Sequence, residues 1–397
     1  MDFFILTILK AALIAFVLLT ALAYIQWVER KVIAHIQLRI GPSRVGPHGL
    51  LQPLADVVKL MTKEDLIPAH VNKFYYVFAP WIAVVLALTS IAVIPLGPNV
   101  DIFGVKTNLG LADLNIGVLF ILGISSVGVY GVALGGWASN NKYALIGGLR
   151  SSAQMISYEL PMALAIASPL LLSNTLNIRE IVDKQGGFLF GFIPQWNVFQ
   201  MPAPQIVSFI IFIIAGFAET NRIPFDLPEA ENELVAGFHT EYSSMKFASF
   251  CMAEYANMVT ISCMATHLFL GGWHPIIPAN YGGDLIPVFI FLGAAALLFY
   301  HGFHPARPKD RITLPIFGAI FTVLGLSFGA PVLKDVLVPL FWFGAKTGFL
   351  LFLFIWIRGT LPRFRYDQLM RFAWLFLFPV AMLNLLVTGF LVAVAGK

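Results

Sequence analysis

The chain has 397 residues, of which 58% are hydrophobic and only 12% are charged, about half the charged share of a soluble domain. The mean hydropathy of +0.82 and the long apolar runs exclude a soluble fold, because a run of about 20 apolar residues spans a bilayer core. The net charge of +4 is not gathered in a solvated basic domain, which excludes nucleic-acid binding. The sequence predicts an all-α polytopic membrane protein.

Ten apolar segments predict about ten transmembrane helices, and we treat 1–397 as a single membrane domain. The segments are 3–27, 74–96, 114–137, 154–173, 205–220, 247–271, 285–303, 312–330, 336–357 and 371–394. The first segment follows Met1, Asp2 and Phe3 without a basic n-region or a small-residue cleavage site, so we expect a retained helix rather than a signal peptide.

The lysine and arginine residues predict the orientation of the spans. Placing both termini outside puts eighteen of the 25 in inner loops, five in outer loops or ends, and Lys10 and Lys346 within spans. Short cytoplasmic loops carry the excess of positive charge in membrane proteins. We therefore expect both termini to lie outside.

The first inner loop, 28–73, is long and contains the Gly41-Pro42 and Gly46-Pro47 turns. Its apolar residues at 50, 51, 54, 57, 58 and 61 have helical spacing. This pattern predicts an amphipathic helix that lies in the membrane interface on the cytoplasmic side.

Seven of the 21 acidic residues fall within 219–254, mostly in the inner loop 219–246. They are Glu219, Asp226, Glu229, Glu231, Glu233, Glu241 and Glu254. A structural interpretation is open for part of this set, because Asp226 and Glu229 have the spacing of a helix N-cap and its capping-box partner. A row of buried carboxyl groups is also typical of a proton path, since desolvation brings carboxyl groups toward proton exchange near neutral pH.

Glu159, Glu254 and Lys346 lie inside predicted spans. Glu254 is eight residues past Lys246, which places it about 12 Å into the membrane. Because an intramembrane charge costs roughly 2.5–3.5 kcal/mol, such groups usually line a cavity, pair with one another or lose their charge. We expect Lys346 to be an internal partner of the buried carboxyl groups.

The sequence lacks the motifs of a resident cofactor. No phosphate loop or dinucleotide fingerprint is present, and Cys251 and Cys263 lack the spacing of a metal or iron–sulfur site. We interpret both cysteines as small core residues. The histidines, including His267, His274, His301 and His304, are not arranged as facing haem ligands in the middle of two spans.

Six segments together indicate a known family. They are Glu29–Lys31, Gln37–Pro42, Gly46–Asp56, Ala218–Leu227, Glu233–Phe238 and Pro362–Leu369. Over nearly the whole chain the sequence closely resembles the H-subunit family of proton-translocating NADH–quinone oxidoreductase (respiratory complex I), which is related to mitochondrial subunit one. This resemblance implies a quinone-binding membrane subunit of a translocating enzyme, with ubiquinone or menaquinone as substrate and no metal, haem, flavin or iron–sulfur cluster of its own.

The resemblance also implies site residues and partners. Matching residue by residue, the quinone path or its interface with the hydrophilic arm comprises Glu29, Arg30, Arg39, Asp56, Arg222, Phe225, Asp226, Arg358 and Arg363. The acidic channel that couples quinone reduction to proton translocation comprises Glu159, Glu219, Glu229, Glu231, Glu233, Glu241 and Glu254, together with Lys346. The implied partners are the iron–sulfur and quinone-site subunits of the arm, small membrane subunits and antiporter-like subunits, in the bacterial cytoplasmic (inner) membrane.

The chain departs from the family pattern in two places. Ser244 stands where the family commonly has Gly, and Ser takes a positive φ less readily, which bears on the local loop conformation. The family usually has eight spans, so 285–330 looks like an inserted helical hairpin, which we expect to be peripheral and unrelated to catalysis.

Two alternative functions remain open. The chain could be the homologous subunit of a membrane-bound hydrogenase, whose partner reduces protons. A stand-alone secondary transporter is disfavoured, because the sequence shows no pair of repeated halves with matching broken helices.

Overall fold

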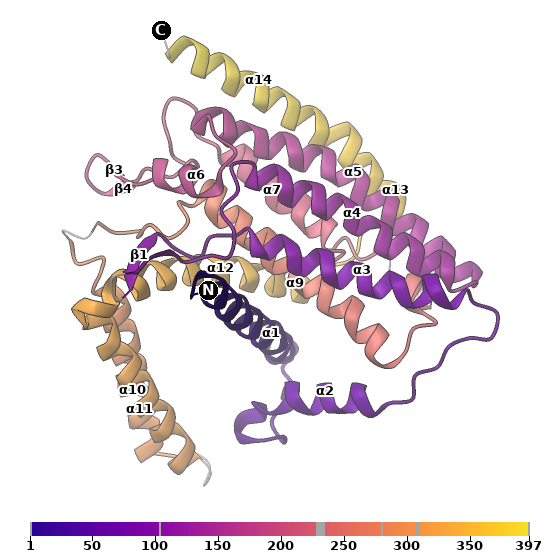
Figure 1. The fold of residues 1–397 in the computed structure, drawn as a ribbon, viewed down its shortest axis with the longest axis horizontal. Coiled ribbons are helices and arrows are strands. Elements are labelled where there is room, and N and C mark those ends of the chain that lie inside the picture. The colour runs from indigo at the N-terminus through magenta and orange to yellow at the C-terminus, as the bar shows by residue number, and fades with distance from the viewer. Residues whose placement is uncertain (1, 103–104, 228–234, 279–280, 306–309, 396–397) are drawn as a thin grey trace.

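The computed structural model describes residues 2–102, 105–227, 235–278, 281–305 and 310–395, and its regular structure is almost entirely helical (Figure 1). The long helices are α1 (Asp2–Ile36), α3 (Lys73–Ala92), α4 (Gly117–Ala138), α5 (Lys142–Ser173), α7 (Ile206–Glu219), α9 (Ser244–Phe269), α10 (Ile286–Phe303), α11 (Asp310–Gly329) and α12 (Pro331–Thr360). Finally, α13 (Tyr366–Arg371) continues through a π-helical segment, Phe372–Leu377, into α14 (Phe378–Ala395). The predicted all-α polytopic membrane fold is confirmed.

A helix occupies each of the ten predicted spans. Within the described part of the chain, eight helical segments are long and apolar enough to cross a membrane, with α13 to α14 counted as one. The other two spans are occupied by α9 and α7. α9 has 26 residues but carries the charged residues Lys246 and Glu254. α7 has only 14 residues and is about 21 Å long, which is shorter than a bilayer core.

Several boundaries differ from the prediction because helices continue beyond the apolar runs. α5 starts at Lys142 rather than near 154. Asn141 caps this start by accepting a hydrogen bond from the Tyr143 amide. α1 continues to Ile36, so the first part of the predicted loop 28–73 is helical. The predicted amphipathic helix is present as α2 (Gln52–Thr62).

The remaining elements are short and lie in the connections. They are the 3₁₀ turns η1 (Pro47–Gly49) and η2 (Gly237–His239), the helix α6 (Ile178–Lys184), and the strands β1 (Asn99–Ile102), β2 (Val105–Asn108), β3 (Phe188–Leu189) and β4 (Ile193–Pro194). β1 pairs antiparallel with β2, and β3 with β4. The periodicity of the sequence did not indicate these two hairpins, which lie in predicted outer loops.

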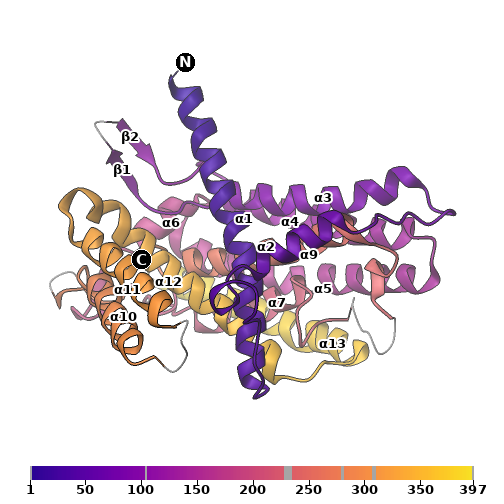
Figure 2. The same ribbon diagram turned by 90° about the horizontal axis from the view of Figure 1, so that it is seen from below.

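Most of the chain shares one hydrophobic core. Residues of α3, α4, α5, α7, α9 and α14 build it, and these helices run side by side in Figure 1. α1 crosses this group at a steep angle (Figure 2). α10 and α11 pack against each other and project from the end of α12 (Figure 1), around a separate cluster of Phe328, Val338 and Trp342.

The loops fall into two sets, as the predicted topology requires. Predicted inner loops contact one another, for example where Asn141 donates to Glu241 and where Arg363 pairs with Asp226. Predicted outer loops also meet, for example where Lys334 pairs with Asp284. These contacts support the predicted sidedness, while the outside location of both termini stays a prediction.

Candidate functional site: a buried acidic cavity beside an ion-pair cluster

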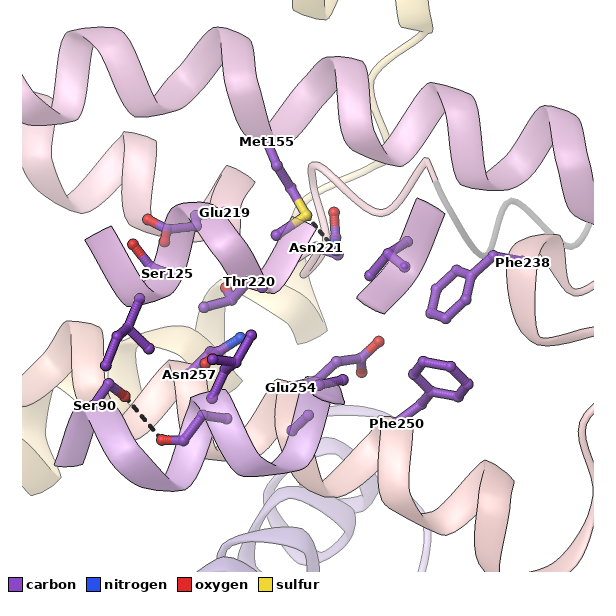
Figure 3. Close-up of a pocket in the computed structure, with 17 residues that line it drawn as sticks. Ser90, Ser125, Met155, Glu219, Thr220, Asn221, Phe238, Phe250, Glu254 and Asn257 are labelled. Atoms are coloured by element: carbon purple, nitrogen blue, oxygen red, sulfur yellow. Dashed lines mark hydrogen bonds between the residues drawn. The ribbon is translucent and has the colours of Figure 1, made fainter. Parts of the chain in front are cut away.

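Glu219 is the last residue of α7, and its side chain lies in the protein interior. Only 8% of this residue is exposed. Its Oε2 atom is buried and has no hydrogen-bond partner among the described residues, while Ser125 of α4 faces the same carboxyl group (Figure 3). A buried oxygen without a protein partner is the kind of group that ordered water satisfies.

The cavity beside Glu219 also receives Glu254, from α9. Asn257 lies between the two carboxyl groups, with Ser125 and Thr220 nearby (Figure 3). The cavity volume of about 40 Å³ is sufficient for water, since one molecule needs roughly 10–15 Å³. Carboxyl and hydroxyl groups around water can pass protons along hydrogen bonds, and the Asn257 amide can orient the water.

This polar lining continues deeper between the helices. A second hollow of about 20 Å³ shares Ser125, Glu219 and Asn257 with the first and extends to Thr260. The Ser90 and Thr260 hydroxyl groups form a hydrogen bond of 3.2 Å there. The polar region therefore extends along α9, between α3, α4 and α7.

Two neighbouring serines of α4 connect Glu219 with Glu159 of α5. Ser126 donates a hydrogen bond to the Glu159 carboxylate, and Ser125 faces Glu219 (Figure 3). Glu159 does not line the cavity, but it is close enough to interact electrostatically with Glu219. The structure thus brings together Glu159, Glu219 and Glu254 of the predicted acidic channel.

The non-helical segment after Glu219 is held by Gln154 of α5. Its side-chain amide donates to the carbonyl oxygens of Ala218 (2.8 Å) and Phe225 (2.7 Å) and lies 3.3 Å from the Asn221 side chain. Irregular backbone at membrane depth requires such partners, because lipid satisfies no hydrogen bonds. Gln154 therefore allows the chain to leave the helix beside the cavity.

The same part of α5 approaches the next inner loop closely. A Cβ atom on Gly147 would lie 2.8 Å from the Gly237 Cα atom and from the Phe238 amide nitrogen, so a larger residue would displace η2. Phe238 packs edge-on against Phe250 of α9, and both rings close one end of the acidic cavity (Figure 3).

A second buried group of charges surrounds Glu29 of α1, which is only 3% exposed. Arg358 of α12 forms an ion pair with its Oε1 atom, and the Arg222 guanidinium lies 3.4 Å from the same oxygen. The Tyr255 hydroxyl of α9 donates to Oε2 at 3.0 Å, and the Arg222 guanidinium stacks on the Tyr255 ring at 4.2 Å. We call these four residues the Glu29 cluster.

The other residues assigned to the quinone path also form pairs. Asp226, buried after α7, accepts a hydrogen bond of 2.9 Å from Arg363. The neighbouring Phe225 ring packs against Tyr158 and Phe364. These contacts join the segment after α7 to the segment between α12 and α13.

α1 and α2 are joined by the ion pair between Arg30 and Asp56, at 2.6 Å. Lys59 and Gln52 of α2 also contact the Asp56 carboxylate, at 3.5 Å and 3.1 Å. Arg39 is exposed beyond the end of α1 and donates to Gln37. An exposed guanidinium of this kind can bind a carboxylate of another subunit.

The acidic set predicted from the sequence is divided in the structure. Glu241 accepts a hydrogen bond of 2.6 Å from Asn141 at the inner surface, beside an open hollow lined by His70 and Lys142. Asp226 pairs with Arg363 outside the cavity. Glu229, Glu231 and Glu233 lie outside the described residues, and the capping interpretation of Glu229 with them.

The expectation for Lys346 was wrong. Instead of meeting a carboxylate of the described residues, its ammonium donates to the backbone carbonyl oxygens of Leu270 (2.6 Å), Gly272 (2.9 Å) and His274 (2.7 Å) and lies 4.2 Å from the centre of the Trp196 ring. These carbonyls follow the end of α9, at the predicted outer side. Three oxygens match the three donors of an ammonium group, which explains why this buried cation needs no acidic partner.

Both cysteines and two of the histidines, His267 and His274, are packed among other side chains of the protein. The fully buried His267 stacks on Phe343, and burial, together with the nearby Lys346, lowers the pKa of His274. Cys263 is buried and Cys251 is half-buried. In the described ranges, no three His, Cys, Asp or Glu side chains are arranged to hold a metal ion.

Sequence reasoning missed several residues of these sites: Ser125, Gln154, Tyr255 and Asn257. Asn257 follows Glu254 by three residues, so helical spacing alone places both on one face. Gln154 and Ser125 stand out as polar residues in apolar segments. No sequence signal indicated the contact between Tyr255 and Glu29, because residues 226 positions apart meet only in the folded chain.

Comparisons with known proteins agree with the family that the sequence motifs indicate. A sequence model of the family described as NADH dehydrogenase matches residues 9–389. The H subunit numbered 1 of the NADH-quinone oxidoreductase of Solibacter usitatus is 66% identical, over 100% of this chain, the hairpin 285–330 included, and 99% of the relative. The H subunit numbered 2 of Koribacter versatilis is 48% identical over 98% of each chain, and the H subunit of Protochlamydia amoebophila is 45% identical over 94% of this chain and 93% of its own.

Proposed function

The chain belongs to the H-subunit family of NADH–quinone oxidoreductase, a multi-pass membrane component of a multi-subunit enzyme, and on this premise we propose that it lines the tunnel through which quinone enters and couples quinone reduction to proton translocation. The observation that carries the coupling proposal is the cavity that joins Glu219 and Glu254 inside the membrane domain.

The quinone path is proposed to lie along the inner ends of α1, α2 and α12. The residues assigned to it gather there in three ion-paired groups: the Glu29 cluster, Arg30 with Asp56, and Asp226 with Arg363. Guanidinium groups held by carboxylates can face a polar quinone head, while apolar side chains between them accommodate an isoprenoid tail.

The coupling route is proposed to start at Glu254 and Tyr255, two consecutive residues of α9. Tyr255 binds Glu29, and the preceding residue, Glu254, lines the cavity. A change of charge near the Glu29 cluster would therefore act on the acidic cavity through consecutive residues of one helix. Close carboxyl groups titrate as a coupled set, so we assign no proton to a single member.

The wider assignment follows from the family. We propose a bacterial cytoplasmic (inner) membrane location, and contacts with the iron–sulfur and quinone-site subunits of the hydrophilic arm and with small and antiporter-like membrane subunits. The redox centres then belong to partners, which accords with the presence of only two cysteines in this chain. The exposed Arg39 is suited to the arm interface.

The coupling proposal is tested by Glu219→Gln and Glu254→Gln in the assembled enzyme. These nearly isosteric changes remove proton exchange while preserving the shape of the cavity, so coupled quinone reduction and proton pumping should fall by about tenfold or more. Glu159→Gln, beside the cavity, should have a smaller effect.

The matched control is Glu180→Gln, since Glu180 lies on α6 and accepts a hydrogen bond from the nearby Thr175. Electron transfer from NADH to ferricyanide monitors assembly of the arm. Parent rates of pumping in both Glu219→Gln and Glu254→Gln enzymes would refute the acidic-channel proposal.

A further inference from the structure

The chain begins α9 with an unusual conformation at Ser244. Its φ is +54°, a left-handed conformation that Gly adopts freely and Ser adopts at some energetic cost. Where the sequence suggested a changed loop conformation, the structure keeps the conformation suited to Gly and adds a hydroxyl group to it. The question is what this hydroxyl group does.

The Ser244 hydroxyl binds the end of the amphipathic helix α2. It lies 2.8 Å from the carbonyl oxygen of Leu60 and 3.0 Å from that of Lys63, and donates its proton between them. The last carbonyls of a helix lack partners within the helix. Ser244 therefore satisfies backbone groups of α2 from another part of the chain, 184 residues away from Leu60.

Neighbouring residues make the same connection. The Ser243 hydroxyl accepts a hydrogen bond of 3.1 Å from the Leu66 amide, and Lys246 pairs with Asp65 at 2.6 Å. We call the contacts of Ser243, Ser244 and Lys246 with residues 60–66 the α2–α9 clasp. Asp65 is half exposed, so its ion pair contributes little, and the serine bonds to backbone carry most of the specificity.

The clasp joins two helices that have separate tasks in the proposed function. α2 carries Asp56, which pairs with Arg30 of α1. α9 carries Glu254 and Tyr255, which face the acidic cavity and Glu29. Much of the apolar surface of α2 is exposed, including Leu54, Val58 and Met61, so few contacts within the chain fix its position.

We propose that Ser244 is a positioning residue, whose hydroxyl group holds α2 against α9 and thereby sets the width of the quinone path at Asp56. This inference rests on the proposed quinone path. The left-handed backbone at Ser244 aims the hydroxyl group at the end of α2. A chain with Gly at this position has the same backbone freedom but lacks the bond.

The test uses the assembled complex with Ser244→Ala and Ser244→Gly. Loss of one net hydrogen bond should accelerate amide hydrogen exchange in residues 60–66 about fivefold. The KM for decylubiquinone should rise about two- to fivefold, with a smaller change in kcat, as the fraction of correctly placed α2 falls. Both variants should change the two measurements in the same direction, since both lack the hydroxyl group.

Ser249→Ala is the matched control, because the Ser249 hydroxyl binds only the Met245 carbonyl within α9. It should leave both measurements at the parent values. Ser244→Gly also protects the test against misfolding, since Gly accommodates the positive φ without strain.

Parent exchange rates in both Ser244 variants would overturn the inference, and so would faster exchange with an unchanged KM. Failure of the clasp and failure of the proposed quinone path are distinguishable through Asp56→Asn. If that change raises the KM and the Ser244 variants do not, only the clasp is refuted. If none of the three changes the KM, the quinone path itself is refuted.

Discussion

Glu29 and Glu219 are both buried carboxyl groups, yet their surroundings differ. Two guanidinium groups and a phenol hydroxyl surround Glu29. Glu219 faces a polar cavity with Ser125 beside it, and its Oε2 atom has no hydrogen-bond partner in the described part of the chain. Inside one membrane domain, the same chemical group is thus held by ion pairs in one place and lines a cavity in the other.

The difference shows how a low-dielectric interior separates two roles. A carboxylate between guanidinium groups joins the helices that supply its partners. A carboxyl group in a small polar cavity that has room for water can exchange a proton or reorient when a nearby charge changes. In the proposed function, the Glu29 cluster therefore holds the helices together, and the acidic cavity is the part that responds to quinone reduction.

The largest expected effect is that of Glu29→Gln. This change leaves Arg222 and Arg358 facing a neutral amide, and breaking a buried ion pair in this way costs roughly 3–5 kcal/mol. We expect a strong loss of assembled complex, measured by yield and thermal unfolding. Adding Arg222→Gln should recover part of the loss, whereas a normal yield from Glu29→Gln alone would contradict this role of the Glu29 cluster.

Lys346→Met extends the comparison to a buried cation. Because the ammonium binds three carbonyl oxygens, its loss should destabilise the connection after α9 by about 1.5–3 kcal/mol. Thermal unfolding measures this effect, and the number of protons pumped per electron should stay unchanged in the complex that assembles. A lower ratio would restore Lys346 to the coupling route that the family resemblance implies.

Asp56→Asn weakens the ion pair between Arg30 and Asp56, which is more exposed than the ion pairs of Glu29. The Arg30 side chain is 42% exposed, so the pair contributes at most about 1 kcal/mol. We expect a KM for decylubiquinone raised by up to about fivefold, with assembly at parent levels. An unchanged KM and unchanged inhibitor sensitivity would separate α2 from the quinone path.

The smallest effect is expected from excision of the hairpin 285–330. Its helices pack around the separate cluster on α12, and the ion pair between Asp284 and Lys334 holds its two ends close enough for a short linker. Quinone reduction and pumping should remain near parent values. An assembled complex that reduces quinone but no longer pumps would show that the hairpin takes part in coupling.

Local patterns in the sequence determined the class of fold. The hydrophobicity of a segment and its amphipathic period depend only on consecutive residues. For this reason helices occupy all ten predicted spans, and α2 lies within the predicted loop 28–73. The family resemblance also singled out residues that meet in the structure, where ion pairs join Glu29, Arg30, Asp56, Arg222, Asp226, Arg358 and Arg363; their part in a quinone path stays a proposal.

Only the tertiary structure decided which charges meet. The spacing of residues within a helix says nothing about what a neighbouring helix presents, so Lys346 was wrongly matched to carboxyl groups although backbone carbonyls saturate it. For the same reason, the acidic residues divide between a cavity, an ion pair and the surface. The hydrogen bond of Ser244 likewise depends on a partner from α2, which sequence neighbours cannot supply.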